Sequence, residues 1–442
     1  MKILREISVT IFILIFFSCT TLTGVLNAAI GPNKIPFHEL ETYLSKNPSI
    51  DTVFIKNGEY KDTEIKIYGV NRDLKILPES IGGVKISGKS TLTFVNSSKI
   101  SFSGFEFYGI ANRSAIIIDH SNEIRIFNNL FDRCGAFQFG KIVRITNGAS
   151  YNKIYNNTFD YLKSMGVVVD VSSSDDVKLL SKQNEIFNNV FINIPNVKAV
   201  YPNSDGNGLE AIQLGQGSPK AMEKEIQTKV YNNLFINIIG DRSEIISVKS
   251  SANFIFENVF LDNDSGITFR VGNNNVFSSN IVYNTRSGLR VFGKGHLIDK
   301  NYFEGGSSGI IIPAANKSNE NANTLEGSFY FQPEDIRVER NLIINPESSG
   351  INIGSKFSNS RKFYPKNLII EENILLTSEK SSPIVSAGNE DISIYEKKNR
   401  NLRTELDKSN FNTEMDSINN VIRAARKFEL KNSKLGIDWT KN

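Results

Sequence analysis

The chain has very little histidine, cysteine or tryptophan. Of its 442 residues, three are histidine, two are cysteine and one is tryptophan. The histidines are His38, His120 and His296, far apart in the sequence, so neither a Ser–His triad nor a histidine-rich metal site is expected. Cys19 lies in the N-terminal segment and only Cys134 remains in the body, so the mature chain can hold no internal disulfide. Its stability must therefore come from packing.

A strong excess of charge is also absent. The net charge is +4, with 22% charged and 40% hydrophobic residues, which is an ordinary globular composition. This mild positive excess tolerates a polyanionic partner without requiring one. We expect no nucleic acid partner, and we expect a monomer.

The N-terminus carries a short apolar run from Ile7 to Phe17, preceded by two basic residues. This run is too short to span a bilayer and predicts a signal peptide within residues 1–29. Two ends stay open: a lipidated Cys19 that anchors the protein in a bacterial membrane, or cleavage near Asn27 to Ala29. The prediction is export, to the bacterial periplasm, to the outer membrane as a lipoprotein, or into the medium.

An internal repeat of the form Asn-x-Ile-x-x-Asn-x-Phe dominates the middle of the chain, as in NKIYNNTF and NEIFNNVF. The key asparagines recur at intervals of 21 to 44 residues, and the shortest intervals set the size of one structural unit. They are Asn129, Asn157, Asn189, Asn233, Asn258, Asn280, Asn301, Asn341 and Asn373. We expect them to form an internal hydrogen-bonded ladder with no role in chemistry.

Short β-branched segments with no helical period lie between these motifs. One such unit cannot bury its apolar face alone, whereas stacked units form a continuous core. The sequence thus predicts an all-β, right-handed parallel β-helix over residues 30–390, with a short helical cap at each end. A leucine-rich repeat would need regular leucines and is not favoured. The expected N-terminal cap is Pro36 to Lys46. Residues 391–442 would form a C-terminal extension, a charged loop to Phe411 and a helix from Asp416 to Leu430.

A second family of strands includes SEIISVK, SGITFRV and SGLRVFG. Aligned at a constant offset of 22 residues, Ile245 stacks on Ile267 and Leu289, and these three side chains would face the core. The residues predicted to point to solvent on the opposite face, with Lys249 at the strand end, are Glu244, Lys249, Thr268, Arg270 and Arg290.

Charges on the outside of a solenoid are usually only solvated, so this pattern alone does not predict a site. Two rival functions stay open. A glycoside hydrolase would need carboxylates on neighbouring coils, but Asp170, Glu210 and Glu244 are scattered in the sequence. A non-catalytic glycan-binding surface protein would need only the positive patch.

At these strands the sequence resembles polysaccharide lyase family six, the alginate lyases and chondroitin B lyases. The motifs are NGLEAIQLG, SEIISVKSS, ITFRVGN and SGLRVFGKGH, in this order between Asn207 and His296. The resemblance covers about Pro36 to Leu376 and implies a β-helix enzyme that cleaves a uronate-containing polyanion by β-elimination. Alginate is the favoured substrate, and dermatan or chondroitin sulfate is the alternative.

The resemblance also implies roles for individual residues. Lys249 would be the general base that removes the proton α to the uronate carboxylate, and Arg270 would assist the leaving oxygen. A lysine acts as a base only in its neutral form, which burial and neighbouring cations favour. Arg290, Gln213 and His296 would belong to the substrate-binding surface.

The family's calcium ion neutralises the substrate carboxylate, and Asn207 and Glu244 match two of its three ligands. Arg242 stands at the third ligand position, where a cation disfavours calcium. Gln213 and Val271 also depart from the family pattern, which has arginine and histidine there. The sequence therefore favours a calcium-independent enzyme in which Arg242 itself pairs with the uronate carboxylate.

Overall fold

The computed structural model describes residues 34–171, 176–216, 223–319, 330–388, 392–403, 416, 418–420 and 422–423. The predicted signal peptide and Cys19 lie outside the described residues. Within the described part of the chain, no helix has the length and apolar character needed to cross a membrane.

Short strands follow one another along the chain in a fixed rotation through three parallel sheets, here called A, B and C. Sheet A contains β1 Lys34–Ile35, β2 Thr52–Ile55, β5 Asn71–Pro78, β8 Ser98–Ser103, β11 Arg125–Phe127, β14 Lys153–Tyr155, β17 Glu185–Phe187, β20 Lys229–Tyr231, β23 Phe254–Phe256, β26 Val276–Ser278, β29 Leu297–Asp299, β32 Arg337–Glu339, β35 Leu368–Glu371 and β38 Ile394–Lys397.

Sheet B contains β3 Gly58–Lys61, β6 Val84–Ser87, β9 Glu106–Tyr108, β12 Leu130–Asp132, β15 Thr158–Asp160, β18 Val190–Ile192, β21 Leu234–Ile236, β24 Val259–Asn263, β27 Ile281–Thr285, β30 Tyr302–Glu304, β33 Leu342–Ile344, β36 Ile374–Thr377 and β39 Arg400–Arg403. Sheet C contains β4 Glu64–Tyr68, β7 Thr91–Val95, β10 Ile116–Asp119, β13 Lys141–Thr146, β16 Met165–Val169, β19 Ile212–Gly215, β22 Ile246–Lys249, β25 Ile267–Val271, β28 Leu289–Val291, β31 Ser308–Ile312, β34 Ser349–Ile353 and β37 Ser382–Ser386.

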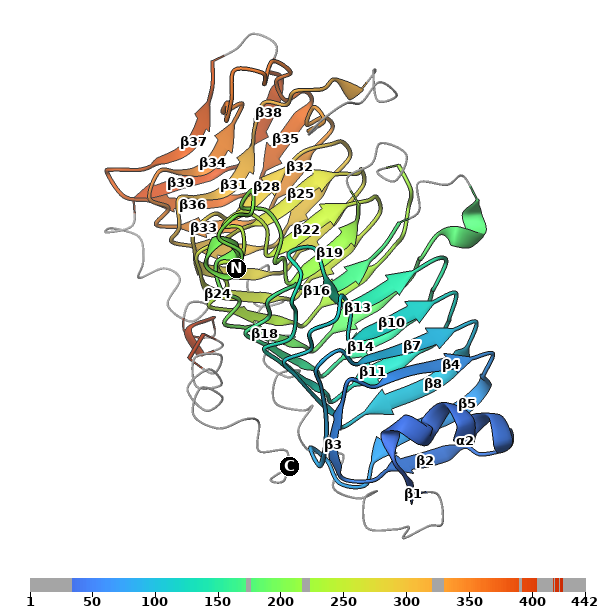
Figure 1. The fold of residues 1–442 in the computed structure, drawn as a ribbon. Coiled ribbons are helices and arrows are strands. Elements are labelled where there is room, and N and C mark those ends of the chain that lie inside the picture. Colours follow the sequence, from blue (N-terminus) through green and yellow to red (C-terminus); the bar gives the residue numbers. More distant parts are fainter. Residues whose placement is uncertain are drawn as a thin grey trace.

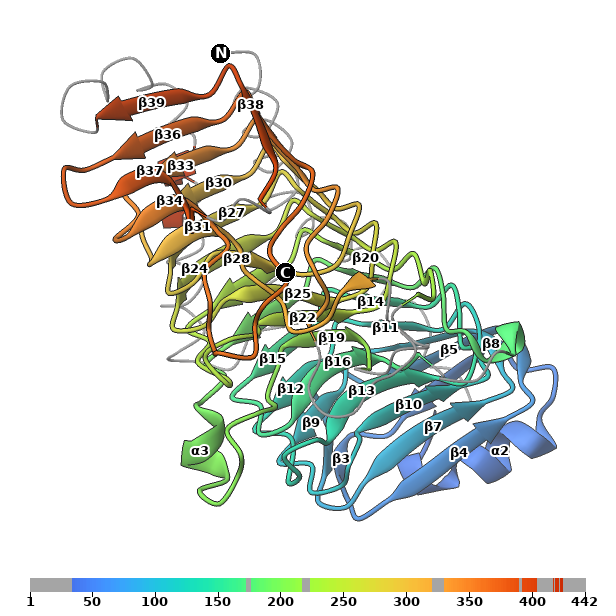
Figure 2. The same cartoon turned by 90° about the horizontal axis from the view of Figure 1, so that it is seen from above.

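This arrangement is a right-handed parallel β-helix, as predicted, in which each coil supplies one strand to each sheet (Figure 1). Figure 2 shows the coils stacked from the blue N-terminal strands to the orange and red C-terminal ones. The few other regular elements are short: the 3₁₀ turns η1 Phe37–Glu39 and η2 Val177–Leu179, and the helices α2 Leu40–Lys46 and α3 Val197–Val200.

The predicted asparagine ladder is confirmed at all of its positions. Each side-chain amide donates to the Oδ1 atom of the asparagine one coil further on, over 2.9–3.1 Å. The ladder runs from Asn129 to Asn373 and ends on Asn399, which the repeat pattern did not identify. Next to it, the rings of Phe107, Phe131 and Phe159 stack inside the core at 4.7–4.8 Å.

The N-terminal cap is also confirmed. Residues Phe37 to Lys46 form η1 and α2, and Phe37, Leu40 and Leu44 are buried in the main hydrophobic core. Their side chains cover the open end of the first coil, which would otherwise expose core residues to water.

The C-terminal extension differs from the prediction. The segment expected to be a loop after Asp391 contains β38 and β39, so the β-helix continues beyond residue 390. Of the predicted helix, residues 416, 418–420 and 422–423 are described and are helical. Ile418 and Ile422 are buried against apolar side chains on the outer face of sheet B, including Ile236 and Leu261.

The predicted pairing of β22 with β25, the first two of the charged strands, is wrong by one residue. Ile246, and not Ile245, pairs with Ile267, and Val248 pairs with Phe269. Between Val248 and Lys249 the register shifts because Arg270 is an extra residue in β25, so that Lys249 pairs with Val271. A constant offset cannot anticipate such a β-bulge, which re-aims a side chain and recurs beside active sites. From β25 to β28 the pairing follows the predicted offset.

Candidate active site

The charged residues singled out in the sequence gather at one place on the outer face of sheet C. Gln213, Ser247, Thr268 and Arg290 are paired across β19, β22, β25 and β28, so their side chains occupy one row along the axis. Lys249 and Arg270 lie next to this row. Three carboxylates lie in the turns that lead from sheet B into sheet C. We call the following seven residues the charge cluster: Glu210, Gln213, Asp241, Glu244, Lys249, Arg270 and Arg290.

Lys249 is held from two sides. Its Nζ donates to Gln213 Oε1 over 2.7 Å and lies 3.7 Å from Glu210 Oε1. Lys249 is only 7% exposed, so its predicted exposure to solvent is wrong, although it lies on the outer face as predicted. Gln213 therefore contacts the lysine directly, and its predicted role in binding substrate stays a prediction.

Glu244 is buried beneath the two arginines. Its Oε1 lies 3.5 Å from an Arg290 nitrogen and its Oε2 lies 3.9 Å from Arg270, while Ser247 donates to Oε2. Burial alone raises the pKa of Glu244, but the positive charges of Lys249, Arg270 and Arg290 outweigh it and hold that pKa below its usual range. The carboxylate is therefore charged and fixes both guanidinium groups.

Two further carboxylates complete the charge cluster: Glu210, named in the sequence only as a candidate for the rival hydrolase, and Asp241, which the sequence interpretation did not identify. Glu210, Asp241 and Glu244 have carboxylate oxygens that all lie within 4.8 Å of one another. Burial raises the pKa of Glu210, and burial together with the other two carboxylates raises the pKa of Asp241 to about 8. Glu210 and Glu244 are 34 residues apart in the sequence and were therefore expected to lie apart. In the structure, the solenoid stacks their turns side by side.

Arg242 does not occupy the position that the sequence suggested. Its backbone is left-handed (φ 64°), its side chain is 56% exposed, and its Nε pairs with Asp264 over 3.3 Å. Asp241 points inward instead, and its Oδ1 accepts the backbone N–H groups of Ser243 and Glu244 at 2.7 and 2.8 Å. The acidic residue that points into the charge cluster is thus Asp241. It lies one position before Arg242, the residue that an ungapped comparison of motifs selects.

Two other predicted site residues have structural partners. Asn207 Oδ1 accepts the backbone N–H of Gly208 over 3.1 Å, so its proposed role as a metal ligand stays a prediction. His296 is 1% exposed, with Nδ1 accepting the Asn275 N–H at 3.1 Å and Nε2 2.9 Å from the Phe292 carbonyl oxygen. The predicted place of His296 on the substrate-binding surface is therefore corrected to a place in the core.

A group of aromatic rings and an additional arginine adjoins Arg270 and Arg290. The Arg361 guanidinium lies 4.0 Å from the Tyr330 ring centre and 5.0 Å from that of Phe292, and Arg270 lies 5.4 Å from the Tyr330 centre. These cation–π contacts stabilise positive charge without neutralising it. Burial and the nearby arginines lower the pKa of Arg361. No sequence motif marked this residue, because it comes from a turn far along the chain.

Some polar atoms of the charge cluster lack a protein partner. Glu210 Oε2 and Arg290 Nε are buried and make no hydrogen bond within the described part of the chain. A buried polar atom without a partner is costly, which suggests that a ligand supplies the partner. A carboxylate oxygen seeks a cation or a donor, and a guanidinium N–H seeks an anion. The cluster therefore fits both a hard cation and the carboxylate of a substrate.

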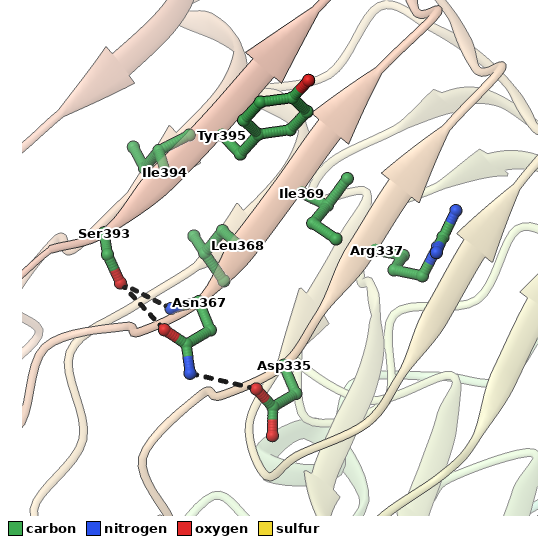
Figure 3. Close-up of a pocket in the computed structure, with 8 residues that line it drawn as sticks. All are labelled: Asp335, Arg337, Asn367, Leu368, Ile369, Ser393, Ile394 and Tyr395. Atoms are coloured by element: carbon green, nitrogen blue, oxygen red, sulfur yellow. Dashed lines mark hydrogen bonds between the residues drawn. The ribbon is translucent and has the colours of Figure 1, made fainter.

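A surface hollow elsewhere on the molecule has a different character. It lies on the outer face of sheet A and is lined by Asp335, Arg337, Asn367, Leu368, Ile369, Ser393, Ile394 and Tyr395 (Figure 3). Asn367 donates to Asp335 over 3.1 Å and its backbone N–H donates to the Ser393 hydroxyl over 2.7 Å. Its polar side chains are exposed, Asp335, Asn367 and Ser393 are bonded to one another, and none of the predicted site residues lies here.

Comparisons with known proteins identify the family and the fold of the chain. The family model described as Chondroitinase B matches residues 36–434. No curated protein matches the chain. The family-six polysaccharide lyase Pedsa3628 from Pseudopedobacter saltans is 22% identical, with a TM-score of 0.68 over 86% of this chain and 95% of that one.

Two further solved structures share the fold. A mannuronic acid specific polysaccharide family 6 lyase from human gut microbiota is 20% identical, with a TM-score of 0.68 over 87% of this chain and 94% of that one. A family-six alginate lyase in complex with a trisaccharide is 19% identical, with a TM-score of 0.66 over 84% and 83% of the two chains. At these identities the likeness establishes the fold.

Proposed function

The chain belongs to the chondroitinase B family and is a polysaccharide lyase, and we propose that it cleaves alginate by β-elimination with Lys249 as the base. The observation that carries the proposal is the charge cluster itself. One buried lysine and two arginines lie on adjoining strands, and Arg290 Nε has no hydrogen-bond partner among the described residues. The alginate lyases among the solved structures with this fold support the choice of substrate.

The chemistry assigns a different task to each cation. Loss of the proton α to a carboxylate adds negative charge to that carboxylate, so a positive group must face it. Arg290, with its free Nε, would bind the uronate carboxylate, and Lys249 would take the proton. The electron pair released from that C–H bond forms a double bond to the neighbouring carbon, and the glycosidic C–O bond there breaks. Arg270, re-aimed by its β-bulge, would stabilise the departing oxygen.

We also propose a calcium site formed by Glu210, Asp241 and Glu244. Calcium binds oxygen ligands at 2.3–2.6 Å, and the mutual spacing of these carboxylate oxygens, with Glu210 Oε2 lacking a partner, fits such an ion. When bound, the ion would supply positive charge to the substrate carboxylate. The expectation of calcium independence depended on Arg242 replacing a ligand, and Arg242 points away from the charge cluster.

A second candidate substrate is dermatan or chondroitin sulfate, because the matching family model is described as Chondroitinase B. Arg361 and Arg290, at the aromatic group beside the charge cluster, would then face the sulfated sugar. Both candidates share the uronate that the proposed elimination requires.

The deciding experiment is a substrate screen. The purified protein is incubated with alginate, mannuronate blocks, guluronate blocks, dermatan sulfate and chondroitin sulfate, and ultraviolet absorbance follows unsaturated uronate ends. Absorbance with alginate supports the proposal, and absorbance with dermatan sulfate alone selects the second candidate. New reducing ends without absorbance would show hydrolysis, and binding without cleavage would show a glycan-binding protein; either result overturns the proposal.

The metal proposal has its own binding test. Calorimetric titration with calcium should show one site, and Asp241→Asn should weaken it by about tenfold or more, because one anionic ligand is lost. Asp335→Asn, in the sheet A hollow, is the matched control and should bind as the unaltered protein does. No calcium binding by the unaltered protein would refute the site, whether or not the enzyme is active.

A further inference from the structure

A short loop, Arg133 to Gly140, carries two exposed phenylalanines at the edge of sheet C where the chain enters from sheet B. Phe137 is 39% exposed and Phe139 is 48% exposed. Two neighbouring exposed aromatic side chains are costly in water, and exposed apolar patches of this kind mark binding surfaces. We call Arg113, Phe137 and Phe139 the aromatic platform.

The loop is firmly tied to the body of the protein. The Phe137 carbonyl oxygen accepts the Ser164 hydroxyl over 2.7 Å and the Gly140 N–H over 2.9 Å. Between the two phenylalanines, Gln138 turns inward and its Nε2 donates to Asp205 over 2.8 Å and to the Asn207 carbonyl oxygen over 2.7 Å. The exposure of the two rings is therefore fixed by the structure, and they are not free to fold back into the core.

The aromatic platform lies next to the segment that carries Glu210 of the charge cluster. The edge of the Phe139 ring lies 3.5 Å from the position that a Cβ atom on Gly208 would take. Gly208 is in the left-handed region (φ 103°) and a side chain there would also meet the Gln138 carbonyl oxygen at 2.9 Å. Two residues further on, Glu210 contacts Lys249. Phe139 thus adjoins the same segment that brings Glu210 to the proposed base.

The chemistry of the aromatic platform suits an anionic sugar. A pyranose ring presents C–H groups on one face, and this apolar face can lie against an exposed aromatic ring. Arg113 lies 4.9 Å from the Phe137 ring centre and is itself exposed, so it offers a positive charge beside the ring. A neutral sugar would need no such charge, whereas a uronate carboxylate would pair with it.

We propose that the aromatic platform is a second sugar-binding subsite, which stacks a uronate ring on Phe139 and Phe137 and pairs its carboxylate with Arg113. This inference rests on the proposed function, because it places one polyuronate chain across both the aromatic platform and the charge cluster. The subsite extends the binding surface toward the N-terminal coils, so only chains long enough to reach it from Lys249 benefit.

The test separates binding from cleavage. Alginate oligosaccharides of increasing, defined length are titrated by calorimetry into Lys249→Arg and into Lys249→Arg with Phe139→Ala. The Phe139 change should weaken binding of the longer oligosaccharides by about tenfold and leave that of the shortest ones unchanged. Phe139→Tyr should restore the affinity, and Tyr395→Ala, which removes an exposed ring from the sheet A hollow, should have no effect.

The active enzyme gives a second readout. Phe139→Ala should raise KM for the polymer with little change in kcat, since the ring lies away from the reacting bond. Equal binding of long oligosaccharides with and without Phe139 would overturn the subsite while leaving the lyase intact. If no uronate polymer is cleaved by the unaltered protein, the proposed function fails instead, and the calorimetric comparison still decides whether Phe139 binds the oligosaccharides.

Discussion

The charge cluster on sheet C and the hollow on sheet A are built from similar residues with different surroundings. In the hollow, Arg337 is about half exposed and pairs with Glu339 and Glu371 at 2.8 and 3.2 Å. In the charge cluster, Lys249 and Glu244 are almost fully buried, and Glu210 Oε2 and Arg290 Nε make no hydrogen bond to any residue that the structure describes. Exposed, paired charges are an ordinary solvated surface. Buried charges with unused hydrogen-bonding capacity are maintained at a cost, which points to a ligand.

The largest expected effect is the loss of activity when Lys249 is replaced. Without that loss, the buried charge cluster would be no more functional than the exposed hollow. Lys249→Ala should lower the rate of unsaturated product formation by roughly 10²- to 10⁴-fold, because the general base is removed. Lys249→Arg keeps the positive charge next to Glu210 and should be equally inactive. Lys66→Ala, an exposed lysine on the same sheet, is the control. Unchanged turnover in the Lys249 variants would make the lysine structural and refute its catalytic role.

The fold was largely predictable from the sequence, because every coil repeats the same local requirement. An asparagine such as Asn157 recurs wherever a side-chain amide must satisfy backbone groups at the same turn, and one repeat reveals all the others. The residues of the charge cluster in β22 and β25 were predictable for a different reason: the resemblance to a family carried Lys249 and Arg270. Both lie on the outer face as predicted, but strand alternation could not show that Gln213 and Glu210 would bury Lys249 there.

The remaining site residues could not be predicted, since they depend on the turns. Asp241 takes the inner position because Arg242 adopts a left-handed backbone, a choice that no periodic pattern encodes. Arg361 reaches the site from a turn between β34 and β35, across the stacked coils. Turn geometry decides these positions, and the turns from sheet B to C and from sheet C to A vary in length, unlike the asparagine turn from sheet A to B, which repeats.

Replacing an asparagine of the interior ladder should lower the stability of the fold without lowering its catalytic activity. Asn280 donates to Asn301 and to two carbonyl oxygens, and it accepts from Asn258, all at 3.0–3.1 Å. Asn280→Ala leaves these buried groups unsatisfied and should lower the free energy of unfolding by about 2–4 kcal/mol, measured by urea denaturation. Activity per folded molecule should be retained. Asn71→Ala, an exposed asparagine of β5, should change stability far less; equal losses would contradict a structural role for the ladder.

His296 should make the fold sensitive to acid. Burial lowers its pKa to about 4 from an ordinary value of 6.5. As the pH falls below 6.5, the unfolded chain binds a proton that the folded chain refuses, so stability is lost until about pH 4, by up to about 3 kcal/mol. His296→Asn should remove this part of the loss, seen as a smaller drop in urea midpoint between pH 7 and pH 4. The same drop in both proteins would show that His296 is protonated within the fold.

The smallest effect is expected for a change in the hollow. This change compares the two surfaces most directly, because the same substitution can be made in the charge cluster. Arg337→Ala removes two ion pairs of a half-exposed arginine, and the buried Glu339 keeps its second partner Arg340, so the loss should be about 0–1 kcal/mol and the urea midpoint should hardly move. Turnover of the polymer should be unchanged, whereas Arg270→Ala, the same change at the charge cluster, should abolish most of it. The pair of variants compares one arginine in two surroundings. A large loss of turnover in Arg337→Ala would mean that the substrate also contacts sheet A. The exposure and pairing of charged side chains would then not distinguish a non-functional surface from a functional site.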